Sequence, residues 1–65
     1  MEYTERKGKY YIQGIMRVEK TPDGWTLFKR VSPVANEYYP IQGEHFDNVN
    51  IALEKADEIV RHMEL

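Results

Sequence analysis

The chain has no cysteine, a single serine (Ser32) and only two histidines, His45 and His62, among its 65 residues. Without cysteine it has no disulfide framework, and two histidines far apart in the sequence do not predict a closed zinc site. A lone serine before a proline, with no Gly-x-Ser-x-Gly or phosphate-binding glycine pattern, offers no nucleophile for catalysis. We therefore predict no catalytic residue, no metal, no cofactor and no enzymatic activity.

Long hydrophobic runs are also absent. No stretch approaches the ~20 apolar residues of a membrane span, and the N-terminal "MEYTERKGKYY" is too polar for a signal peptide. A chain of this length forms one domain and buries only roughly 60% of the surface that it exposes when unfolded. The expectation is a cytoplasmic domain with no membrane association, and one too thin to hold a small-molecule substrate.

Charge is nearly balanced overall, at -2, but unevenly distributed. Residues 1–31 contain seven basic and four acidic residues, a balance of +3, whereas residues 32–65 contain two basic and seven acidic residues, a balance of -5. The N-terminal half is therefore expected to present the basic surface of the molecule.

Alternating apolar residues predict the strands. Residues 1–9 are polar without a period and are expected to be flexible. The alternation that begins at residue 10 predicts a strand over about 10–20, with Gly14 marking a bulge or a close backbone approach. The sequence "TPDG" predicts a turn, followed by a second strand over 25–31. A third strand over 37–42 is expected at the sheet edge, because Pro40 cannot donate a ladder hydrogen bond.

The turn allows two hairpin registers. A three-residue loop with a glycine bulge pairs Thr21 with Trp25, whereas a four-residue loop pairs Lys20 with Trp25. We favour the second register, because it places Leu27 on the same face as Val18. A slip of one residue would scatter the apolar side chains over both faces.

Apolar residues at three- and four-residue spacings predict an amphipathic helix over about 48–64. Asp47 is the expected N-cap, with Phe46 packing on Ile51 as a hydrophobic staple. The fold class is then α+β: a three-stranded antiparallel β-meander (10–20, 25–31, 37–42) with one C-terminal amphipathic helix (48–64) packed on one face. In domain terms this is a flexible segment over residues 1–9 and a single βββα domain over residues 10–65.

The stretch Glu44-His45-x-Asp47 has the residue types of a metal or acid–base site. A metal needs three or four converging ligands, and a general base needs a held partner and a pocket. The same residues also fit the end of a strand followed by a helix cap, and we favour this structural interpretation. His45 is then an exposed loop residue.

The sheet face turned away from the helix is the better candidate for function. In the favoured register it presents Tyr11, Ile15, Arg17, Phe28 and Arg30. Arginines among exposed aromatic side chains are typical of binding hot spots, and one helix cannot cover both faces of a sheet. An exposed sheet surface without a partner is the alternative. Tyr38 and Tyr39 on the edge strand are possible further contacts, and a free edge also permits a homo-oligomer.

Two functions are open on this evidence. The first is a small non-enzymatic interaction module, such as an inhibitor, an antitoxin-like factor or an accessory regulator, that binds a protein partner through the open sheet face or the edge strand. The second is a DNA- or nucleic-acid-binding module that uses the same basic, aromatic-containing face. Steep salt dependence of binding distinguishes the second from the first.

Short segments resemble known families. "GEHFDNVNIALEKA" resembles the strand end, cap and helix of integrase arm-binding and plant ethylene-response DNA-binding domains. "DGW", "QGE" and "ALEKA" are similar to the strand and helix layout of HicB-type antitoxin modules. The resemblances cover at most half of the chain and imply an interaction module with a sheet and a helix. No functional residue is carried over from either family, because the shared residues are those that any cap and amphipathic helix require.

Overall fold

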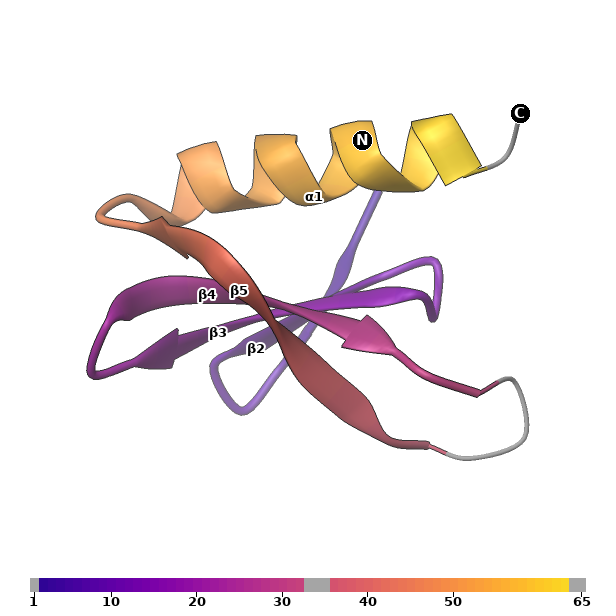
Figure 1. The fold of residues 1–65 in the computed structure, drawn as a ribbon, viewed down its shortest axis with the longest axis horizontal. Helices are drawn as coiled ribbons and strands as arrows, with labels where there is room; N and C mark the ends of the chain where they lie inside the picture. Colours follow the sequence, from indigo (N-terminus) through magenta and orange to yellow (C-terminus); the bar gives the residue numbers. More distant parts are fainter. Residues whose placement is uncertain (1, 33–35, 64–65) are drawn as a thin grey trace.

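The computed structural model describes residues 2–32 and 36–63, which form an antiparallel sheet with one helix across it (Figure 1). The elements in chain order are β1 (Thr4–Arg6), β2 (Lys9–Ile12), β3 (Met16–Thr21), β4 (Gly24–Arg30), β5 (Tyr38–Phe46) and α1 (Val49–Met63). The predicted α+β class, with an antiparallel sheet and one C-terminal helix, is therefore confirmed. No helix within the described ranges has the length and apolarity needed to cross a membrane.

The predicted number of strands is wrong, because the sheet has five strands in the order β1-β2-β3-β4-β5. The region expected to be one strand over 10–20 is a hairpin of β2 and β3. Gln13 (φ 52°) and Gly14 (φ 67°) turn the chain, and the N–H of Ile15 donates to the carbonyl of Ile12. Ile12 pairs with Met16, so even-numbered residues stay on one face through the turn. The alternation therefore continues through the hairpin as it would in one long strand.

The first strand lies within the segment that we expected to be flexible. Thr4 pairs with Tyr11 and Arg6 pairs with Lys9, so β1 forms one edge of the sheet. Lys7 (φ 53°) and Gly8 (φ 80°) form the tight turn between β1 and β2. Two-residue hairpin turns of this handedness favour Asn-Gly or Asp-Gly. In the Lys-Gly pair of this turn only the glycine matches that preference, so the sequence indicated the turn weakly.

The favoured register of the second hairpin is confirmed, since Lys20 pairs with Trp25 and Val18 pairs with Leu27. The last strand lies at the other edge of the sheet as predicted, but it continues past residue 42 to Phe46. Its pairing with β4 shifts between Phe28, which pairs with Pro40, and Thr26, which pairs with His45. This irregularity forms a bulge in β5 between the two segments that pair with β4.

The core lies between α1 and the sheet. Its fully buried members are Ile12, Met16, Val18 and Leu27 from the strands and Ala52, Leu53, Ala56 and Val60 from the helix. Alanines on the inner side of the helix leave little side-chain bulk between the helix backbone and the strands. Burial of the larger apolar side chains contributes about 1.5–3 kcal/mol each, which makes this layer the main source of stability.

The helix begins at Val49, one residue later than predicted. Asn48 Oδ1 accepts hydrogen bonds from the N–H groups of Asn50 (2.7 Å) and Ile51 (3.4 Å), so Asn48 is the N-cap and the prediction of Asp47 is wrong. The predicted staple is also wrong. Ile51 is 53% exposed, and Phe46 packs against the core instead. The predicted helix end at residue 64 lies outside the described residues.

Candidate interaction surface

In the part of the chain that the structure describes, α1 covers one face of the sheet and no helix covers the other (Figure 1). The central row of the uncovered face crosses all five strands through the partners Thr4, Tyr11, Arg17, Phe28 and Pro40. The residues that flank this row along the strands, such as Ile12 and Leu27, point into the core. Because side chains alternate between faces along a strand, the row itself points away from α1. We call this surface the open face.

Arg17 on β3 is the centre of the open face. Its guanidinium carbon lies 4.5 Å from the ring centroid of Phe28 and 5.2 Å from that of Tyr38, and its Nη2 lies 3.0 Å from Glu19 Oε1. The Arg17 side chain is only 19% exposed, and its buried Nε has no hydrogen-bond partner among residues 2–32 and 36–63. Glu19 Oε1 makes no well-aligned hydrogen bond, so its contact with Arg17 is an ion pair. Two rings and one carboxylate therefore restrain Arg17.

The contacts continue towards β1. Tyr11 and Tyr38 meet edge to face with their ring centroids 5.9 Å apart, and the guanidinium carbon of Arg6 lies 4.8 Å from the Tyr11 ring centroid. Arg6, Tyr11, Tyr38, Arg17 and Phe28 thus form a continuous series of cations and rings. We call these five residues the open-face cluster. Each exposed cation–ring contact contributes about 0.5–1 kcal/mol.

The structure brings together only some of the predicted site residues. Tyr11, Arg17 and Phe28 belong to the open-face cluster. Arg30 points to the same face, where its Nη1 donates to the carbonyl of Gly14 (3.4 Å). Ile15 does not lie on the open face as expected, because it follows the turn directly and packs against the core.

The two edge tyrosines separate. Tyr38 belongs to the cluster, and its hydroxyl donates to the carbonyl of Gly14 (3.3 Å). Tyr39 is 57% exposed and pairs with Lys29, which places it on the opposite side of the sheet. Pro40 and the bulge interrupt the edge of β5, and such features hinder the addition of another strand.

Sequence reasoning missed Arg6 and the role of Tyr38. Arg6 was assigned to a flexible segment, and Tyr38 was separated from Tyr11 by 26 residues with no register to connect them. The only local signals were Gly8 and Gly14, each at the second position of a tight turn. Taken together as two hairpin turns, they would have placed β1 and β2 beside β3.

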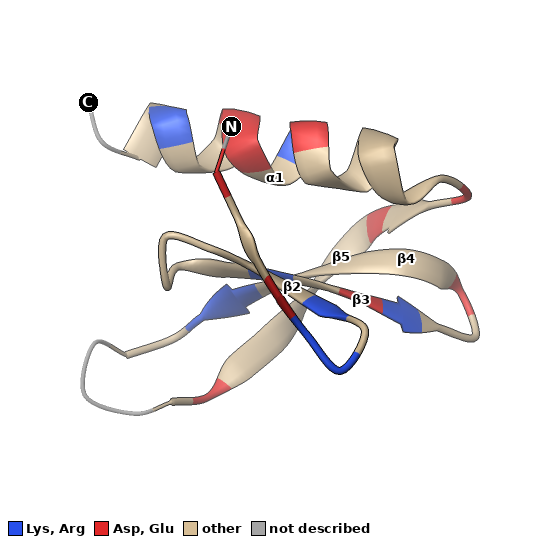
Figure 2. Ribbon diagram, turned by 180° about the vertical axis from the view of Figure 1, so that it is seen from behind, with Lys and Arg blue, Asp and Glu red and all other residues tan. Residues whose placement is uncertain are grey.

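Charge differs between the two sides of the domain. At its strand positions the open face carries four basic residues, Arg6, Lys9, Arg17 and Arg30, and one carboxylate, Glu19. Figure 2 shows Lys and Arg on the strands and in the turn between β1 and β2, while α1 carries both signs. The open face is therefore a basic surface around aromatic rings.

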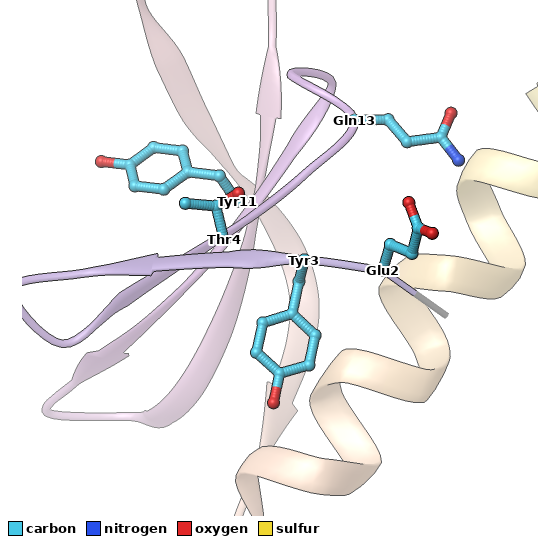
Figure 3. Close-up of a pocket in the computed structure, with 5 residues that line it drawn as sticks. All are labelled: Glu2, Tyr3, Thr4, Tyr11 and Gln13. Carbon is cyan, nitrogen blue, oxygen red and sulfur yellow. The ribbon is translucent and has the colours of Figure 1, made fainter.

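One hollow lies at the β1 edge and has a volume of about 540 Å³. In Figure 3, Thr4 and Tyr11 extend to one side of the strands and Tyr3 extends to the other, while Glu2 and Gln13 lie towards the helix. The lining side chains diverge around a strand edge, unlike the converging polar groups of most ligand sites. This hollow supports no catalytic assignment.

His45 is exposed, as predicted, but it lies within β5 and has a buried partner. Its Nδ1 lies 2.9 Å from the hydroxyl of Thr26, which is 1% exposed and in turn lies 2.8 Å from the hydroxyl of Thr21. The interpretation of His45 as a loop residue is wrong, because His45 lies in β5. The cross-strand pairing of Thr26 with His45 creates the contact. Among the described residues, no three His, Cys, Asp or Glu side chains come together as metal ligands.

Comparison of the chain with protein-family models, curated proteins and solved structures finds no match. The geometry of the open face is therefore the feature of the molecule that indicates a function.

Proposed function

We propose that this protein is a small non-enzymatic interaction module that binds an acidic surface of a protein partner through its open face. The observation that carries the proposal is Arg17, whose guanidinium lies against the rings of both Phe28 and Tyr38. A side chain of this length ordinarily loses about 1.5–2 kcal/mol of conformational freedom when it is fixed. In this protein the Arg17 side chain is already restrained by its neighbours in the folded state, so binding of a partner removes less conformational freedom from it.

Charge identifies the chemistry of the partner. Four basic side chains against one carboxylate on the open face favour carboxylates on the bound surface. Arginine and aromatic residues are also the residue types that dominate binding energy at protein interfaces. An inhibitor, an antitoxin-like factor and an accessory regulator all fit this mode of binding. The lack of cysteine fits a cytoplasmic setting for such a module.

Nucleic acid is the second candidate, because the same face is basic and aromatic. Sheets that bind single strands stack bases on exposed ring faces. On the open face the guanidinium of Arg17 already lies against Phe28 and Tyr38, and that of Arg6 lies against Tyr11. Glu19 beside Arg17 also repels phosphate. These contacts favour a protein partner.

The test uses partner capture from the source cell by cross-linking, followed by affinity measurement with the purified partner. Phe28→Ala should weaken binding by tenfold or more while the circular dichroism spectrum stays unchanged, because Phe28 contacts Arg17 on a face without core residues. Ile51→Ala is the matched control: Ile51 is also apolar, is 53% exposed and lies on α1, so its loss should leave affinity unchanged.

Arg17→Glu provides a second variant, which reverses the charge at the centre of the open face and should abolish binding. Equal affinity of all three variants would refute the proposal. Binding of labelled single-stranded or duplex DNA, with an affinity that falls steeply with salt, would favour the second candidate instead. Protein binding centred on rings should change little over the same salt range.

A further inference from the structure

A second hollow lies beside the bulge of β5. It has a volume of about 360 Å³ and is lined by Thr21, Asp23, Thr26, Pro40, Ile41, Gln42 and His45. The register of β5 against β4 shifts by three residues between Pro40, which pairs with Phe28, and His45, which pairs with Thr26. The β5 residues between these two positions do not pair regularly with β4, and this irregularity produces the hollow. Its volume is within the range of small-ligand sites, about 300–1,000 Å³.

The hydrogen bonds around Thr26 favour one tautomer of His45. The hydroxyls of Thr21 and Thr26 lie 2.8 Å apart, the Thr21 hydroxyl lies 3.1 Å from the carbonyl of Gly24, and Thr26 lies 2.9 Å from His45 Nδ1. If Nδ1 carries a hydrogen, it donates to Thr26, Thr26 donates to Thr21 and Thr21 donates to Gly24. All three contacts then contain a hydrogen.

The other tautomer satisfies fewer contacts. If Nδ1 has no hydrogen, Thr26 donates to it, and the Thr26 hydroxyl then has no hydrogen left for the carbonyl of Gly24, which lies 3.3 Å away. The single hydrogen of Thr21 serves either Thr26 or that carbonyl, so one of these two contacts has no hydrogen. Because Thr26 is 1% exposed, water cannot readily enter the network from its side. The network thus favours a hydrogen on Nδ1, which leaves the lone pair of a neutral His45 on Nε2.

We infer that this hollow is a docking site for a tryptophan or tyrosine side chain of the protein partner, whose N–H or O–H donates to His45 Nε2. Pro40 and Ile41 supply an apolar wall for the ring, and His45, which also lines the hollow, is the residue that offers an acceptor. Asp23 lines the hollow and would repel a carboxylate of the partner there. The hollow therefore differs in charge from the basic part of the open face. Such amphipathic rings are frequent anchors in interface pockets.

This inference depends on the proposed function for the identity of the partner, but indole tests the hollow without the partner. At about pH 8, indole should cause saturable amide shifts at Thr21, Ile41 and Gln42. 1-Methylindole lacks the N–H and should bind about fivefold more weakly, the value of one hydrogen bond. His45→Phe should abolish the difference between the two probes.

The tautomer has its own measurement, the long-range ¹H–¹⁵N spectrum of the histidine rings. His62 is an internal reference, because its Nδ1 lies 2.9 Å from the carbonyl of Glu58, which can only accept. His45 should match His62 in the wild type and in Thr26→Ser, and should lose that match in Thr26→Val. The Ser variant keeps the test valid if loss of the hydroxyl unfolds the domain.

Three results would overturn the inference: no saturable shifts with indole, equal affinity for 1-methylindole, or a hydrogen on Nε2 in the wild type. Arg17→Ala distinguishes this failure from failure of the proposed function. That variant should lose the acidic partner and still bind indole, because Arg17 does not line the hollow.

Discussion

Gly24 begins β4 with φ +114°, in the region of backbone space that residues with a Cβ rarely adopt. A Cβ at this position would lie 2.8 Å from the carbonyl oxygen of Phe46 on the neighbouring strand. The glycine therefore serves the turn after Asp23 and also allows β5 to approach. The residues "TPDG" showed the first requirement in the sequence. The second became visible only when β5 was in place.

Replacement of Gly24 separates these two effects. Gly24→Ala should reduce the free energy of unfolding by about 2–3 kcal/mol, since the close contact adds to the cost of the positive φ. Gly8→Ala is the matched control, because Gly8 has φ +80° but no atom within 4 Å of its would-be Cβ. That substitution should cost about 1 kcal/mol. Equal losses in urea denaturation would show that the contact with Phe46 carries no cost.

Helix α1 shows why element boundaries are harder to predict than elements. Its apolar stripe predicted the helix correctly, and Ala52, Leu53, Ala56 and Val60 are buried as that stripe requires. Asp47 and Asn48 are both good N-cap residues, so composition did not distinguish them. Pairing of Phe46 with Trp25 extends β5 to residue 46 and places Asn48, not Asp47, at the first turn of the helix.

The cap can be tested by paired substitutions. Asn48→Ala removes the acceptor of two backbone N–H groups and should lower the free energy of unfolding by about 1 kcal/mol. Asp47→Ala should change it by less than about 0.5 kcal/mol, as for an ordinary surface residue. Thermal denaturation of the two variants measures the difference. A larger loss of unfolding free energy in Asp47→Ala than in Asn48→Ala would show that Asp47, the residue predicted from the sequence, is the N-cap.

At the scale of the whole molecule, sheet and helix share one core. Four strand residues and four helix residues are the fully buried apolar members, and neither element has a second buried cluster in the described residues. Separation of the helix from the sheet would expose the apolar side of both layers to water. A domain of this size is also close to the lower limit for a stable single core.

Unfolding should therefore be a single cooperative transition. Trp25, the only tryptophan, packs against the core from β4 and reports on the sheet, while far-ultraviolet circular dichroism at the helical band reports on α1. The urea midpoints from the two signals should coincide. Loss of the helical signal before the change in Trp25 fluorescence would show that α1 detaches from an independently folded sheet.

The sequence by itself determined the local features of the protein: the helical stripe, the turn at Pro22-Asp23-Gly24, the edge position of the last strand and the parity of the apolar residues. These depend on neighbours within a few positions. The assignment of apolar residues to one face was correct even though one strand was predicted where the structure has a hairpin. Ile12 pairs with Met16 across the unexpected turn, so both residues stay on the same face. Parity was enough to place Arg17 and Phe28 together on the open face.

The tertiary structure decided what depends on distant residues. It added β1 and so brought Arg6 to Tyr11, and it brought Tyr38 to Arg17 across the sheet. It also placed Thr26 beside His45, which gave the histidine a held partner and a hollow. The physical reason is that these contacts follow from strand order and from the shift in β5 pairing. Both are set by packing of the whole sheet and leave no periodic signal in the chain.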